Sequence, residues 1–158
     1  LPTLPELLRS LVALEEASDA EVIILDSSWD ELALRAASAS ELALIVADTD
    51  RISIRAAENT AAALGDIQAK LILNRFSLEN PVAIVPILES VHLPLAGIIP
   101  EEPRLRELEN LGQPLLLPKD SLLPIAYRNI VCRLEGGHMP LLHKMPRIKR
   151  RKLLQKML

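Results

Sequence analysis

Cysteine and aromatic residues are scarce in this chain of 158 residues. The single cysteine, Cys132, excludes an intramolecular disulfide framework and a zinc site built from several cysteines, and it favours a reduced, cytoplasmic setting. Aromatic residues make up 2% of the chain, as Trp29, Phe76 and Tyr127. Stacking platforms for single-stranded nucleic acids are therefore disfavoured, and the core must be aliphatic.

Long apolar segments and leader sequences are also lacking. No uncharged apolar run reaches the roughly 18 residues of a membrane-spanning helix, and no signal peptide is visible. Because the chain begins with Leu1 rather than Met, we expect a processed product, an expression product or a fragment.

Glycine-rich and catalytic motifs are missing as well. The chain has five scattered glycines and no G-x-x-x-x-G-K-[ST] loop, so no visible segment offers the nest of backbone N–H groups that holds a triphosphate. There is no G-x-S-x-G motif, and we identify no catalytic nucleophile with a base. The three histidines lack the spacing of metal ligands, which argues against zinc. They are His92, His138 and His143.

Charge is distributed unevenly along the chain. The formal net charge is −3, yet seven basic residues and no acidic one lie between Lys144 and Lys156. A helix there would place Leu153, Leu154, Met157 and Leu158 on one side, beside the basic run Lys149, Arg150, Arg151 and Lys152. Such a tail suits an anionic membrane surface, with nucleic-acid phosphates or a solvated tail as the alternatives.

Short β-branched runs alternate with helical patterns, which predicts an α/β fold. Unalternated apolar runs at 22–25, 42–47, 71–73 and 95–99, with a weaker one at 115–117, are typical of parallel strands covered on both faces. Helices are predicted at about 4–17, 52–64 ending at Gly65, after Asn80-Pro81, at 105–111, and from Ser121 to Gly136. We therefore predict an α/β domain over 1–137, with a mostly parallel sheet and flanking helices, and a basic amphipathic tail over 138–158.

Polar residues follow three of these predicted strands. Asp26 ends the first run, Asn74 and Arg75 end the third, and Pro100, Glu101 and Glu102 follow the fourth. Carboxyl ends of parallel strands are where functional groups collect, since ligands bind there in open α/β sheets. Each of these residues, taken alone, is better explained as a turn residue, a cap or a solvated loop.

The order of these segments resembles the MinD/ParA family of deviant-Walker P-loop ATPases, in its carboxyl-terminal half, and most closely its MinD members. The segments, in chain order, are VIILDSS (22–28), LIVADT (44–49), SIRAA (53–57), LILNRF (71–76), LAGIIPE (95–101), NLGQP (110–114) and AYRNI (126–130).

The resemblance implies an incomplete P-loop NTPase-like, three-layer fold that uses ATP and magnesium in an ATP-dependent system for placing the division site or partitioning cargo. Asp26 would be the Walker B carboxylate, meeting magnesium through water only when nucleotide is bound. Asn74, with Arg75, would read the adenine edge, and residues 100–102 would flank base and ribose. The tail would bind the inner membrane face from the cytoplasm.

The chain departs from the family pattern in two respects. The family's phosphate-loop half is absent, and Ser27-Ser28-Trp29-Asp30 stands where the family usually has Ser-Pro-Ala-Gly. An acid at that switch position would repel phosphate, so we do not expect this chain alone to hydrolyse ATP. Loss of the phosphate-loop strand would leave a hydrophobic sheet edge open. We expect that edge to be closed by a homodimer, by rearranged strands, or by a partner that supplies the missing amino-terminal half.

Three functional interpretations remain open at this point. The chain is a MinD-like module of a positioning ATPase, a degenerate relative that works in interaction or membrane recruitment, or an unrelated α/β adaptor whose basic tail binds nucleic acid. The sequence predicts Asp26, Asn74 and Pro100 on one rim under the first interpretation.

Overall fold

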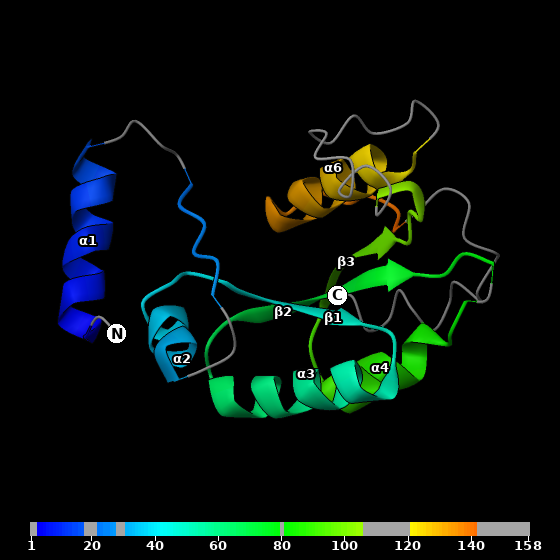
Figure 1. Cartoon of the computed structure of the whole chain (residues 1–158), viewed down its shortest axis with the longest axis horizontal. Coiled ribbons are helices and arrows are strands. Elements are labelled where there is room, and N and C mark those ends of the chain that lie inside the picture. The colour runs from blue at the N-terminus through cyan, green and yellow to red at the C-terminus, as the bar shows by residue number, and fades with distance from the viewer. Residues whose placement is uncertain (1–2, 18–21, 28–30, 80, 106–120, 142–158) are drawn as a thin grey trace.

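A computed structural model describes residues 3–17, 22–27, 31–79, 81–105 and 121–141. A three-stranded parallel sheet forms its centre, and helices lie on both faces (Figure 1). This arrangement confirms the predicted α/β fold class. The elements are α1 (Leu4–Ala17), α2 (Glu31–Ser38), β1 (Ala43–Asp48), α3 (Arg51–Leu64), β2 (Ala69–Phe76), α4 (Ile84–Val91), β3 (Leu95–Pro100) and α6 (Leu123–Leu134).

The strands lie in the order β1-β2-β3, and each is joined to the next by a helix. Parallel neighbours require such crossovers, because a tight turn cannot return the chain to the same end of the sheet. The register pairs Asp48 with Asn74, and Phe76 with Pro100. The residues at the carboxyl ends of the three strands therefore lie at the same end of the sheet.

The larger core lies between the sheet and helices α3 and α4. Ile45, Leu71, Leu73 and Ile98 meet the buried apolar residues of these two helices. Phe76, the one aromatic residue in this core, is fully buried. The core is aliphatic apart from Phe76, as the scarcity of aromatic residues predicts.

Helix α6 covers the opposite face, over β3. Ile72 and Ile99 pack there against Leu123 and Ile130. Close contact depends on Gly97, because a Cβ at that position would lie 2.2 Å from Cγ1 of Ile130. The glycine of the LAGIIPE segment therefore lets the helix approach the strand.

The prediction of a strand at residues 22–25 is wrong. The segment is in no helix or strand, and its apolar side chains are exposed, Val22 by 74% and Ile24 by 86%. A strand needs a neighbour for its backbone hydrogen bonds, and no described residue pairs with this segment. Helix α2, which follows it, was not predicted from the sequence.

Helix boundaries agree in part with the predictions. Gly65 ends α3 with a φ of 59°, as a glycine after a helix should. Helix α4 begins at Ile84 rather than at Pro81, and Pro86 lies in its first turn, where a missing N–H leaves no hydrogen bond unmade.

Several predictions fall on residues outside the described ranges. They are the strand at 115–117, most of the helix at 105–111, the NLGQP segment, Trp29 and Asp30, and the tail from 142 onward. The division at residue 137 stays a prediction. Among the described residues, none of the helices combines the length and apolar character needed to cross a bilayer.

Candidate functional site

The carboxyl ends of β1, β2 and β3 form a polar rim. Asn74 lies opposite Asp48 in the register, and the N–H of Glu101 donates to the carbonyl of Phe76 at 3.0 Å. Four of the predicted site residues, Asn74, Arg75, Pro100 and Glu101, therefore lie at the ends of adjacent strands.

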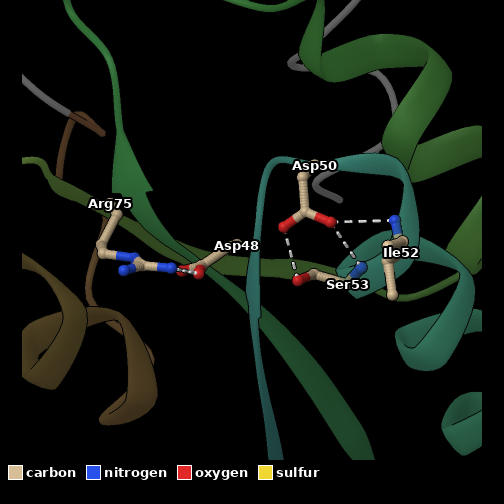
Figure 2. A network of polar contacts seen from close by, with 5 residues as sticks. All are labelled: Asp48, Asp50, Ile52, Ser53 and Arg75. Atoms are coloured by element: carbon tan, nitrogen blue, oxygen red, sulfur yellow. Dashed lines mark hydrogen bonds and ion pairs between the residues drawn. The ribbon is translucent and has the colours of Figure 1, made fainter.

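An ion pair joins two of these ends. The guanidinium of Arg75 donates to the carboxylate of Asp48, as Figure 2 shows. The hydrogen bond with Asp48, together with its negative charge, raises the pKa of Arg75. Arg75 also has a φ of 47°, in the left-handed region that side chains other than Gly, Asn and Asp rarely adopt. The sequence pattern identified Arg75 as a candidate but did not identify its partner.

Asp50 is a second carboxylate on this rim, and it caps α3 (Figure 2). Its side chain accepts from the N–H groups of Ile52 at 2.9 Å and Ser53 at 3.0 Å, and from the hydroxyl of Ser53 at 2.6 Å. The hydrogen bond from the Ser53 side chain, with the backbone bonds, lowers the pKa of Asp50. The Asp50 carboxylate therefore acts as the N-cap of α3.

Glu102 is paired within its own loop. The guanidinium of Arg104 donates to its two carboxylate oxygens at 2.7 and 3.0 Å, and this pair lowers the pKa of Glu102. The Glu102 carboxylate is thus held in an ion pair, whereas Glu101 beside it is exposed.

An open groove of about 330 Å³ lies beside β1 and α3. Val46, Asp48, Ser53, Thr60 and Asn74 are among the residues that line it. This volume lies at the lower end of the range for small-molecule sites. The groove therefore brings Asn74, a predicted site residue, to a surface large enough for a small polar ring.

The groove suits the base of a nucleotide better than its phosphates. The Asn74 amide offers a donor and an acceptor, which matches the edge of a purine. Asp48 and Asp50 add negative charge at the rim, and the Arg75 guanidinium is paired with Asp48. Within the described ranges, no three His, Cys, Asp or Glu side chains gather as a metal site. The residues present thus fit adenine and do not fit a magnesium triphosphate.

Asp26 is not brought to this rim. Segment 22–27, blue in Figure 1, runs on the side of the molecule where α1 and α2 lie. The strands point their carboxyl ends toward the opposite side. The predicted gathering of Asp26 with Asn74 and Pro100 is therefore absent from this structure, because residues 22–25 are not held in the sheet.

A second open groove, of about 930 Å³, was not predicted from the sequence. It lies between α3 and α4, and Ile52, Arg55, Val82, Pro86 and Ile87 are among its lining residues. Ile52 is 83% exposed there. No signal in the sequence pointed to this groove, because the exposure of Ile52 and Val82 is seen only in the structure.

Comparison with known proteins shows what this arrangement resembles. No family model matches the chain. A septum site-determining MinD protein of Guillardia theta is 33% identical over 86 residues, which is 51% of this chain and 32% of the relative. The Synechocystis MinD is 33% identical over 81 residues, covering 48% of this chain and 30% of the relative.

Solved structures extend the similarity over most of the chain. The MinD cell division protein of Aquifex aeolicus superimposes with a TM-score of 0.75 at 25% identity, over 88% of this chain and 63% of that one. The same organism's MinC:MinD complex gives a TM-score of 0.76 at 24% identity, over 89% and 62%. This chain is MinD-like in sequence and in fold.

The similarity to MinD is partial in length. The chain matches less than a third of the length of the curated MinD relatives, and about three-fifths of the solved MinD chains. The resemblance read from the segment order is confirmed to this extent. Which half of MinD the match represents stays a prediction.

Proposed function

We propose that this chain is a MinD-like module of an ATP-dependent system that places the division site. The observation that carries the proposal is the MinD superposition over 88% of the chain, with Asn74 lining a groove at the carboxyl end of β2. Asn74, with Arg75, Pro100 and Glu101 nearby, is the part that would hold the adenine and ribose. Catalysis needs a phosphate-binding segment, since the described residues provide none.

Asp26 would meet the magnesium only after residues 22–25 are paired as a strand. Magnesium with ATP would supply charge neutralisation at the transferred phosphate. What this chain's own residues do is narrower: the Asn74 amide orients the base, and the Asp48–Arg75 pair fixes the ends of β1 and β2 beside it.

Turnover measurements test the enzymatic part. The chain alone should hydrolyse no ATP with magnesium, and it should gain activity when a phosphate-loop segment of MinD is joined to it. Asn74→Leu in that fusion should raise KM for ATP more than it lowers kcat, because the amide acts on base binding. Equal activity of the fusion and of the free MinD segment would contradict the proposal.

The tail over 138–158 would hold the module at the cytoplasmic face of an anionic membrane. Each basic residue near such a surface contributes about 1 kcal/mol, or roughly fivefold in affinity. Exchanging Lys149, Arg150, Arg151 and Lys152 for glutamine should therefore weaken flotation with phosphatidylglycerol vesicles at least tenfold. Leu153→Ser with Leu154→Ser should weaken it too, and a chain ending at residue 141 should not float.

The two alternatives predict different results in the same assays. A degenerate interaction protein is favoured by the Asp48–Arg75 pair, which engages a cation beside the groove-lining residue Asn74. Such a protein would float with vesicles while the fusion stays inactive. An adaptor with a nucleic-acid tail would shift DNA in a salt-sensitive way that needs residues 147–152. A matched control, Lys70→Gln on β2, should change none of these readouts.

A further inference from the structure

The chain turns back along helix α6 after the helix ends. Gly136 has a φ of 86°, in the region that favours glycine, and the N–H of Gly137 donates to the carbonyl of Cys132 at 2.8 Å. A Cβ on Gly137 would lie 2.5 Å from Sγ of Cys132, so glycine is what allows this close approach. The two glycines therefore direct the chain back over the helix instead of away from it.

A buried amide holds the returning chain. Asn129, one turn before Cys132, is 5% exposed, and its side-chain N–H donates to the carbonyl of Pro140 at 3.1 Å. Leu141 then packs against the larger core, to which α6 contributes Ala126. Residues 137–141 thus run along α6 toward its first turn, and we call them the strap.

Much of the strap is open to solvent. His138, Met139 and Pro140 are exposed along it. The hydrogen bond from Asn129 favours the closed strap by about fivefold, which is the usual net effect of one such bond. The strap is therefore closed in this structure, but it is held weakly enough to open.

The strap joins the body of the chain to the basic tail. Seven of the 18 basic residues lie between Lys144 and Lys156, so residues 1–143 hold 11 basic and 21 acidic residues, a net charge of −10. An anionic lipid surface attracts the tail and repels this body. The repulsion is screened over about 8 Å at physiological salt. Binding is therefore favoured when the tail reaches the surface and the body stays farther away than that.

The strap sets how far the body can stay from the basic part of the tail. When the strap is closed, residues 142–148 separate Leu141 from Lys149, where the basic run begins, and such a segment spans at most about 25 Å. Opening adds residues 137–141, or up to about 17 Å, which exceeds the screening distance. The closed strap therefore keeps the acidic body closer to any surface that the tail binds.

We propose that Asn129 is a positioning residue that fastens the strap to α6, and that the closed strap restrains the basic tail from binding an anionic lipid surface. The inference rests on the proposed function, since it takes membrane binding by the tail as its basis.

Labelling of Cys132 with N-ethylmaleimide measures whether the strap is closed. Cys132 is the one cysteine of the chain, and Gly137 lies against its thiol. Asn129→Leu removes the donor while keeping a side chain of similar size, so Cys132 should react about fivefold faster in this variant than in the unaltered chain. An equal rate would show that Asn129 does not hold the strap and would overturn the proposal.

A second substitution opens the strap through a different contact. Gly137→Ala would place its Cβ 2.8 Å from the carbonyl oxygen of Cys132, a backbone atom that cannot rotate away. This variant should label as fast as Asn129→Leu, and it carries the test if the leucine variant fails to fold. Val131→Ala is the matched control, because Val131 is 54% exposed on the same helix, and it should label at the unaltered rate. A control that labels as fast as the two variants would mean that α6 loosens as a whole, against the proposal.

Flotation of the same chains with phosphatidylglycerol vesicles tests the restraint. Because the cost of opening is removed, both open variants should bind about fivefold more tightly than the unaltered chain and the control. The gain should shrink as salt is raised, since salt screens the repulsion of the acidic body. If none of the four proteins floats at low salt, the membrane role of the tail fails, and the restraint fails with it. If the open variants float no better than the unaltered chain, the membrane role stands and the restraint alone is wrong.

Discussion

The side chains of Asp48 and Arg75 form an ion pair that joins the carboxyl ends of β1 and β2. The pair lies next to Asn74, which lines the groove beside β1. It therefore sets the charge of the rim beside the amide that we propose for base binding.

Two substitutions of Arg75 separate its charge from its backbone conformation. Arg75→Gln removes the ion pair but keeps a side chain at a φ of 47°, whereas Arg75→Gly removes the pair and relieves the left-handed strain. We expect the glycine variant to unfold at the higher temperature of the two, in thermal denaturation followed by circular dichroism. A higher midpoint for the glutamine variant would show that the backbone at Arg75 is unstrained.

The hydrogen bonds to the Asp50 carboxylate predict that the stability of the folded chain depends on pH. Its pKa is lowered in the folded chain from an ordinary value of 3.8, so its contribution is fully present above about that pH and is lost as the pH falls through the folded pKa. Asp50→Ala should lower the melting temperature by a few degrees at neutral pH and should reduce this acid sensitivity.

Asp50→Asn is the matched control for the cap. Asparagine also caps helices, because its side-chain oxygen accepts the same N–H groups, but it does not titrate. The variant should keep most of the stability at neutral pH and lose part of the acid dependence. If it is as unstable as Asp50→Ala, the charge rather than the hydrogen bonds holds the start of α3.

The contact between Gly97 and Ile130 predicts an overpacked variant. Gly97→Ala places a Cβ 2.2 Å from the Ile130 side chain, and overpacking of this kind costs about 1–3 kcal/mol. Ile130→Ala alone should cost about 2–5 kcal/mol, because it leaves a cavity. The double variant should be less destabilised than the two losses added together, measured by urea denaturation. Additive losses would mean that α6 shifts away instead of clashing.

Local sequence signals predicted the parallel sheet well. Unalternated apolar runs identified all three strands, and Gly65 identified the end of α3, because these features depend on neighbours close in the sequence. The rim residues Asn74 and Pro100 followed from the same logic, since parallel strands end at one edge.

Features that depend on distant partners could not be predicted. Residues 22–25 have the composition of a strand, yet they pair with none of the strands that the structure describes. In α6, the apolar residues Ile125 and Val131 are 43% and 54% exposed, whereas Ala126 and Ile130 are buried. The position of β3 beneath the helix decides which side is covered, and no pattern within the helix records it.

Binding of adenosine and of ATP to the isolated chain, followed by nuclear magnetic resonance at the Asn74 side-chain amide, tests the central claim most directly. The account predicts that both ligands perturb this amide, and that ATP with magnesium binds no more tightly than adenosine, because the rim offers carboxylates and no phosphate cradle. Much tighter binding of ATP, or shifts confined to the groove between α3 and α4, would contradict it.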